Sequence, residues 1–232
     1  MKRFGIAVMI VSGLVSFLEG HSQGMVVTGS PSGEVLKERD YTDVKGSAYL
    51  LETWESGSVI DETGKEYPNL LLRYNSYKDK IEAKDKGKAL ELDAKLYKQF
   101  TITYAESESG VERKRTFKNG FSDIPGASPL NYFEVLYDGK YAFLKRIKTD
   151  LIEETISNYG TGEKVKRFAL METYYILPAQ GKTKVVGKLT KKNFIEALGS
   201  EGAKIESYLD KEKVKLKSEK SFVMAVAYLE TL

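Results

Sequence analysis

The sequence has no cysteine and a single histidine, His21. The lack of cysteine excludes disulfides, thiolate nucleophiles and thiolate zinc sites. His21 lies in a segment that we expect to be removed from the mature protein, which would then have no imidazole either. That loss would exclude nucleophiles activated by histidine and metal sites built on imidazole. Stability must therefore come from a hydrophobic core.

The chain also lacks a strong excess of one charge. It has 36 Lys and Arg against 33 Asp and Glu, a net charge of +3. Loss of Lys2, Arg3 and Glu19 would leave +2. A charge this close to zero produces no strong field toward nucleic acid or a membrane. The basic clusters at 113–115 and 213–217 are small and lie next to acidic residues, so nucleic acid is not an expected partner.

The first residues have the form of a secretory signal peptide. A short basic start, Met1–Arg3, precedes an apolar run from Phe4 to Leu18, and Gly20–Ser22 offers small residues for cleavage before Gln23. A membrane anchor is the alternative, but the run is shorter than the roughly 18–20 residues that a spanning helix needs. We expect residues 1–22 to be removed and the protein to be exported, to the periplasm, the outer membrane or the exterior. No later stretch is apolar enough to span a membrane, and no cysteine is present for a lipid anchor.

The mature chain divides into three parts by pattern. Residues 23–46 are weakly patterned and predict a flexible arm. Residues 47–189 are expected to form a β-rich domain. From Ser47 to Thr103, short β-type runs alternate with turn signals every 8–12 residues, which predicts an antiparallel meander, sandwich or partial barrel. Residues 190–232 change to helical spacing and predict a small helical part packed on the β domain. The fold class is therefore α+β. The β-type runs are 58–60, 65–67, 70–74, 80–83, 88–92, 99–104, an edge strand at 113–117, 168–177 and 183–189.

A central β-hairpin is expected from Tyr132 to Ile147. The Asp138-Gly139 pair suits a two-residue type I′ turn, in which both central residues have positive φ. That turn would set Phe133 opposite Leu144 and Val135 opposite Ala142. After the hairpin, residues 149–158 predict a short helix, and 160–164 a flexible loop, because the spacing does not fit a P-loop.

Three helices are expected at the C-terminus. Thr190 suits the N-cap of the first and Gly199 its end, Ser200 suits the N-cap of the second, and Ser218 suits that of the third. In the third helix, one apolar stripe would contain Phe222, Val226 and Leu229.

Three stretches carry a resemblance: Leu72–Asp79, Leu136–Lys140 followed by Leu144–Arg146, and the helix start Leu189–Phe194. From about Ser47 onward the chain resembles a loose group of secreted proteins of Gram-negative bacteria that have no assigned function. The resemblance implies export and a β-then-α layout. It carries no active site over to this chain.

The candidate binding residues are Arg73, Tyr74 and Tyr77, because two tyrosines and an arginine at a strand end can stack on a sugar or a peptide. The alternative is that one tyrosine belongs to the core and Asn75 shapes the turn. Trp54, the only tryptophan, is expected in the core. The carboxylates follow no catalytic or calcium-loop motif, so we predict no catalytic residue, metal site or cofactor.

Two functional hypotheses follow. The preferred one is an exported, non-catalytic envelope or secreted protein that binds a partner protein, a glycan or a surface component. The other is a hydrolase that acts through carboxylates or a Ser/Lys pair, which would need two convergent groups with shifted pKa values in a cleft.

Overall fold

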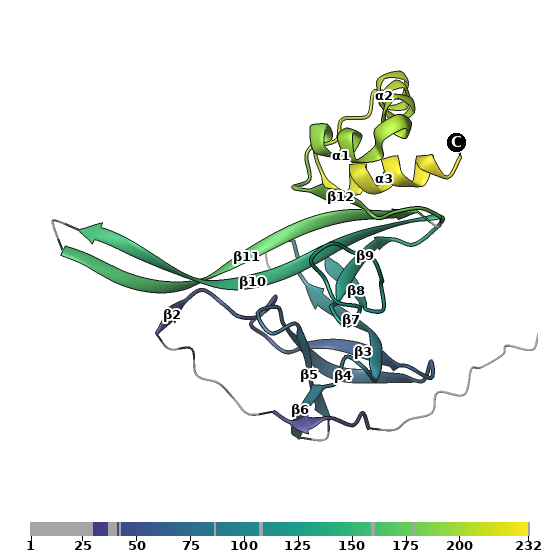
Figure 1. Ribbon diagram of the computed structural model, residues 1–232. Helices are drawn as coiled ribbons and strands as arrows, with labels where there is room; N and C mark the ends of the chain where they lie inside the picture. Colours follow the sequence, from purple (N-terminus) through teal and green to yellow (C-terminus); the bar gives the residue numbers. More distant parts are fainter. Residues whose placement is uncertain are drawn as a thin grey trace, which may run out of the picture.

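The computed structural model describes residues 30–36, 41, 43–85, 87–106, 109–158, 161–178 and 180–231. The expected signal peptide lies outside this range. The described residues form one open sheet of 12 strands followed by three short α-helices, which confirms a β-rich part with a small helical part after it (Figure 1). The strands are β1 (Glu34–Val35), β2 (Val44–Lys45), β3 (Glu55–Asp61), β4 (Glu66–Asn75), β5 (Lys80–Asp85), β6 (Lys88–Leu92), β7 (Tyr97–Ala105), β8 (Glu112–Lys118), β9 (Phe133–Tyr137), β10 (Tyr141–Asn158), β11 (Thr161–Pro178) and β12 (Lys184–Gly187).

The strand order is β1-β6-β5-β4-β3-β7-β8-β9-β10-β11-β12, and neighbours on this path are antiparallel. Hence most of the sheet is a meander in which sequence neighbours pair, as the regular turn signals predict. β2 is the exception, because it pairs parallel with β11. The short strands β1 and β2, which lie in the described part of the segment 23–46, therefore attach to the sheet, β1 through β6 and β2 through β11.

The largest core lies under β3 to β8. It is rich in aromatic rings, and Phe100 stacks on Phe117 with ring centroids 4.6 Å apart. Tyr74 and Tyr132 pack against the same rings. Ile147 of β10 also lies in this core. The sheet is therefore curled, so that β10 comes back toward the first strands of the meander. β8 joins β9 only through Phe117 and Lys118, so Glu112–Thr116 is an outer edge, as its charges predict.

The central hairpin forms between β9 and β10, but its predicted turn is wrong. Tyr137 pairs with Phe143 and Val135 with Leu144, so the connection is longer than two residues. Gly139 does not have the positive φ of a type I′ turn. The C-terminal helical part sets the loop instead, because the Glu230 carboxylate accepts a hydrogen bond from the Tyr141 N–H at 3.4 Å. Tertiary contacts outweigh the local turn preference here.

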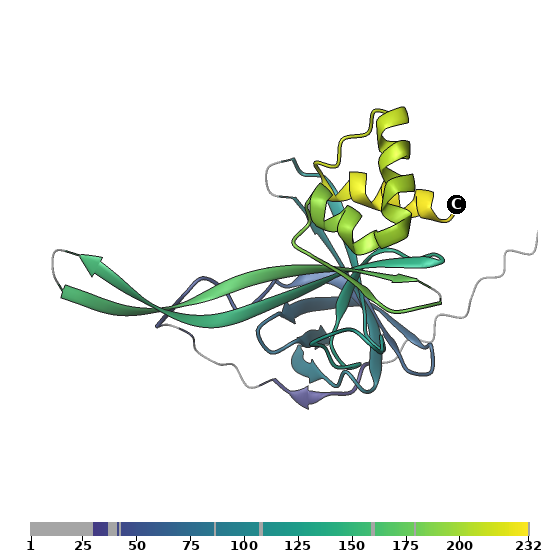
Figure 2. The same cartoon turned by 45° about the horizontal axis from the view of Figure 1, so that its top comes forward.

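The helix predicted for 149–158 is also wrong, since β10 is a single 18-residue strand that includes these residues. It pairs residue by residue with the equally long β11, from Tyr141 with Pro178 to Asn158 with Thr161. The β-branched residues of this stretch, among them Thr149, Ile152 and Thr155, favour such a strand. Residues 161–164 of the expected loop belong to β11, and Gly160 lies outside the described residues. Figures 1 and 2 both show this two-stranded ribbon projecting well beyond the rest of the sheet.

The helices are α1 (Lys191–Leu198), α2 (Gly202–Lys211) and α3 (Glu219–Leu229). The Thr190 and Ser218 N-caps are confirmed, because each side chain accepts a hydrogen bond from a backbone N–H of the first turn. The Ser200 N-cap is wrong: a 3₁₀ turn over Gly199–Glu201 leads directly into α2. Gly202 lies so close to Ile195 that a Cβ there would meet the Ile195 carbonyl oxygen, so the chain passes tightly from α1 to α2.

The helices share a core with the near end of the ribbon. Phe143, Tyr174 and Ile176 from β10 and β11 lie in one buried cluster with Phe194 and Phe222 from the helices. Figures 1 and 2 place the helices on one side of the ribbon and strands β3 to β6 on the other. The ribbon is therefore held between both parts at its near end.

Candidate functional site

The structure separates the three predicted binding residues. Successive side chains of a strand point to opposite faces, so Arg73 and Tyr74 of β4 cannot act together. The Arg73 guanidinium lies over the rings of Tyr49 and Trp54, 3.9 Å and 4.5 Å from their centroids. It also donates two hydrogen bonds to Glu82, at 3.0 and 2.7 Å. Glu82 is buried, so this arginine neutralises an internal carboxylate.

Tyr74 is a core residue, and its prediction as a binding residue is wrong. Its side chain is 1 % exposed and packs on Phe100 and Phe117. Its hydroxyl donates to Asp79 Oδ1 at 2.5 Å. Burial, followed by the charge of Asp79, raises the pKa of Tyr74 well above its ordinary value. Asn75 Oδ1 accepts from the Lys78 N–H at 3.0 Å, which is the turn role that the alternative interpretation gave it.

Tyr77 remains on the surface, 38 % exposed, at the base of the ribbon. Its ring packs on Tyr41 and on Phe168 of β11, with centroids 6.4 and 5.2 Å away. Phe168 pairs with Leu151 and is itself buried. Of the three predicted residues, only Tyr77 lies next to a larger exposed surface.

That surface lies on the ribbon. Thr149 pairs with Leu170 and Leu151 with Phe168, so these four side chains share one face. Leu151 is 41 % exposed and Leu170 is 50 % exposed. We call Tyr77, Leu151 and Leu170 the ribbon patch. Leu151 was not predicted as a binding residue because 149–158 was expected to be a helix, and Leu170 was not predicted because its β-type run, 168–177, does not show which face is exposed. The β-branched residues Thr149 and Ile152 carry a strand signal that argues against the helix.

The ribbon also has an unpaired edge. β9 pairs with β10 only from Phe143 to Lys145, and no described strand continues along the outer edge of β10 beyond that point. The Thr149 N–H points outward and donates to the Ser76 carbonyl at 3.1 Å. Since every second residue of a strand faces the same neighbour, the backbone groups of Leu151, Glu153 and Thr155 face outward as well.

Two exposed ion pairs in the projecting part of the ribbon divide by strand. The exposed carboxylates Glu153 and Glu154 lie on β10, and their partners Lys164 and Arg167 lie on β11, at 3.0 and 2.6 Å. Hydrogen bonding to Arg167 lowers the pKa of Glu154, so it stays ionised at neutral pH. From Asp150 to Thr155 the charged residues of β10 are all acidic, so this part of its outer edge is the acidic one.

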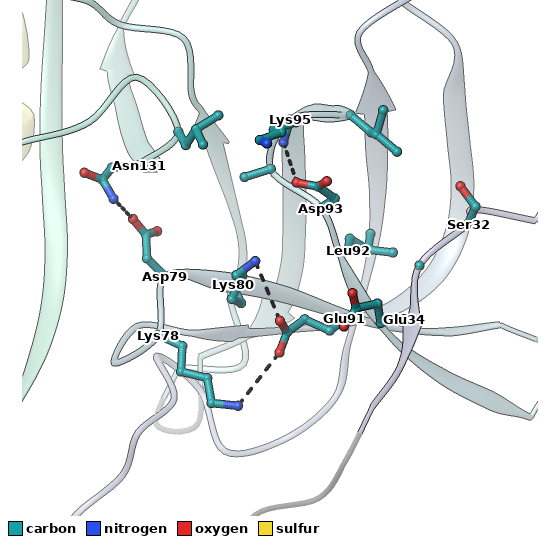
Figure 3. A pocket seen from close by; sticks show the side chains of 14 residues that line it. Ser32, Glu34, Lys78, Asp79, Lys80, Glu91, Leu92, Asp93, Lys95 and Asn131 are labelled. Atoms are coloured by element: carbon teal, nitrogen blue, oxygen red, sulfur yellow. Dashed lines mark hydrogen bonds and ion pairs between the residues drawn. The ribbon is translucent and has the colours of Figure 1, made fainter.

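A separate open pocket of about 550 Å³ lies between the β4–β5 turn, β6 and the loop around Asn131 (Figure 3). Its charged groups are largely paired with one another. Lys78 and Lys80 both approach Glu91, at 3.8 and 3.6 Å. Asp93 accepts a hydrogen bond from the Lys95 backbone N–H at 2.9 Å. The pocket therefore presents mixed charge, with four carboxylates and three lysines in its lining.

Asp79 lines this pocket. Burial raises its pKa, and hydrogen bonds from the Tyr74 hydroxyl, the Asn131 amide and the Tyr132 N–H lower it again without cancelling the rise. The Asn131 amide donates to Oδ2 at 2.6 Å, as Figure 3 shows. These contacts join the β4–β5 turn to the loop before β9, so Asp79 has a structural role that accounts for its burial.

Lys145 is the buried lysine that a Ser/Lys mechanism would require. Its ammonium lies 2.9 Å from Glu134 and 2.7 Å from Glu219 of α3. Burial lowers its pKa, but the charge of Glu134 and the hydrogen bonds to Glu219 and Glu134 outweigh burial and raise it overall. A lysine with a raised pKa stays protonated and cannot serve as a general base near neutral pH. Lys145 instead ties the sheet to the start of α3.

Among the described residues, no three acidic side chains gather in a way that could hold a metal ion. None of the described helices is long and apolar enough to cross a membrane. The chain matches no known protein family, no curated protein and no solved structure. A functional proposal therefore depends on the chain's own geometry.

Proposed function

We propose that this protein is an exported, non-catalytic protein that binds a partner protein through the β10–β11 ribbon. The main support is the projection of the ribbon beyond the body with Leu151 and Leu170 exposed on one face. The apolar surface of leucines on a projecting element is removed from water only when another molecule covers it. Export is supported by the form of residues 1–22.

The internal ion pairs agree with a rigid support for such a ribbon. Arg115 and Lys145 both bind Glu134, and Lys145 also binds Glu219, so β8, β9, β10 and α3 are joined through the buried pair Glu134–Lys145. Helices cover one side of the ribbon's near end and the sheet core covers the other. A projecting strand pair with a fixed base loses little conformational entropy when it binds.

A photo-reactive amino acid placed at Leu170 in the native host tests the proposal. We expect a cross-linked adduct with one defined protein, whereas the same group at Leu71, which is similarly exposed on β4, should give none. Adducts with glycan or lipid at position 170 would show that the ribbon binds a surface component and not a partner protein. Equal cross-linking at both positions would contradict binding through the ribbon.

Hydrolysis is the second candidate, and Asp79 is the observation that favours it. A carboxyl with a raised pKa at the wall of a 550 Å³ pocket is a possible general acid. Substrate panels that include esters, peptides and glycosides would test it. A rate that Asp79→Asn abolishes while the melting temperature stays unchanged would put hydrolysis ahead of partner binding.

A further inference from the structure

We infer that the outer edge of β10, from Leu151 to Thr155, accepts a basic, extended segment of a partner protein as an added β-strand. This inference rests on the proposed function and specifies the partner's chemistry. An exposed strand with unpaired N–H and C=O groups is a template for strand addition. Backbone hydrogen bonds would provide the affinity, and the side chains beside the edge would select the sequence.

The geometry of the edge fits this mode. Thr149 already directs its N–H outward to Ser76, which fixes the alternation of the residues that follow. Leu151, Glu153 and Thr155 then present their backbone groups to the outside, and all three side chains are exposed. The added strand would begin where the contact with Ser76 ends and would run beside the ribbon patch. Leu151 belongs to both the edge and the patch, so one bound segment could cover both.

Charge decides between possible occupants. A second copy of the chain, paired by its own β10, would bring Glu153 and Glu154 close to the same carboxylates of its partner, and like charges across strands are destabilising. A basic segment would instead meet opposite charges. The existing ion pairs to Lys164 and Arg167 are exposed, so exchanging them for contacts with a ligand costs little.

The test uses the full mature chain and short synthetic peptides in which valine alternates with lysine. We expect the lysine peptide to bind more tightly than its glutamate counterpart by about fivefold, because opposite charges on facing strands attract and like charges repel. In amide hydrogen exchange followed by NMR, the Leu151, Glu153 and Thr155 amides should slow when the lysine peptide is added. In the bound peptide, every second backbone N–H should face the edge of β10. Methylation of these nitrogens should abolish binding, whereas methylation of the other set should leave binding intact.

Two variants make the test specific. Glu153→Pro removes an outward N–H without removing a hydrogen bond to β11, and should abolish peptide binding, whereas Glu153→Thr keeps the N–H and should retain most of it. Glu153→Lys combined with Glu154→Lys should reverse the preference toward the glutamate peptide. Circular dichroism and the melting temperature of each variant check that the ribbon still forms.

The outcomes separate this inference from the proposed function. Equal binding of both peptides, or exchange rates of the three amides that do not change, would overturn strand addition. If the ribbon still cross-links to a partner protein in that case, the proposed function stands and the partner covers the ribbon patch by another mode. Self-association through β10, seen as a dimer that Glu153→Pro dissociates, would overturn the choice of a basic segment.

Discussion

The hydroxyls of Ser76 and Thr149 lie 2.7 Å apart in the protein interior, although the residues are 73 positions apart in the sequence. The Thr149 N–H also donates to the Ser76 carbonyl at 3.1 Å. Ser76 follows β4, and Thr149 lies where the ribbon leaves the body. Among the described residues, no backbone hydrogen bond is formed by the outer edge of β10 beyond this contact.

Thr149→Val should reduce the free energy of unfolding by about 1 kcal/mol, because it removes one buried hydrogen bond while keeping the shape of the side chain. Ser76 retains its hydrogen bond to the Ala48 carbonyl, which limits the loss. Denaturant unfolding measures the change. Thr155→Val, at an exposed position of the same strand, is the matched control and should change stability little. Equal effects of both substitutions would show that the contact with Ser76 contributes nothing.

Glu134→Gln should destabilise the protein at pH 7 by about 3 kcal/mol, because it removes one partner from a buried charge network. Burial raises the pKa of Glu134, but Arg115 and then Lys145 outweigh burial, so its pKa in the folded protein is lowered. The stabilisation by ionised Glu134 is present above the unfolded-state pKa of about 4.3 and is lost as the pH falls through the lower folded value.

The difference in stability between wild type and Glu134→Gln should therefore shrink as the pH falls below about 4.3. Denaturant unfolding at a series of pH values gives this difference. Glu153→Gln, whose carboxylate pairs with Lys164 on the exposed ribbon, serves as the control and should change little at any pH. A difference that stays constant across the pH range would contradict a role for the Glu134 charge.

A fragment from Thr190 to Leu232 should be largely unfolded by circular dichroism. The core that holds the helices together includes Phe143, Tyr174 and Ile176 from the ribbon, and isolated helices of this length are marginal in water. As a control, the complementary fragment is added, and the helices should then form. A cooperative thermal transition of the isolated fragment would make it an independent domain.

Export is a separate prediction. Mature protein purified from the native host should begin at Gln23 or within a few residues of it, and intact-mass measurement checks this. A mass that still includes Met1–Ser22 would contradict cleavage and would return His21 to the mature chain.

The sequence predicted much of the fold because its signals are local. The turn signal between the runs 58–60 and 65–67 and the N-caps Thr190 and Ser218 act within a few positions, and the structure confirms the elements that they delimit. It failed at Asp138-Gly139, where Glu230 from the far end of the chain contacts the loop, and at 149–158, where pairing with β11 outweighs a short helical pattern.

The candidate site was harder to predict than the fold. The three predicted residues are close in sequence but lie in different environments. Arg73 belongs to an internal ion pair, Tyr74 to the core and Tyr77 to the surface. The exposure of Leu151 and Leu170 depends on how far the ribbon extends beyond its supports. Long-range pairing decides that length, and a local pattern contains no information on it.

The affinity of the cross-linked partner for a variant that combines Leu151→Ser with Leu170→Ser tests the central claim most directly. Isothermal titration calorimetry should show a loss of at least about tenfold, because burying two leucines on binding contributes more than 1.4 kcal/mol. Leu71→Ser, at an equally exposed leucine outside the ribbon, should bind as wild type does. Wild-type affinity of the ribbon variant, with its fold intact by circular dichroism, would contradict binding through the ribbon.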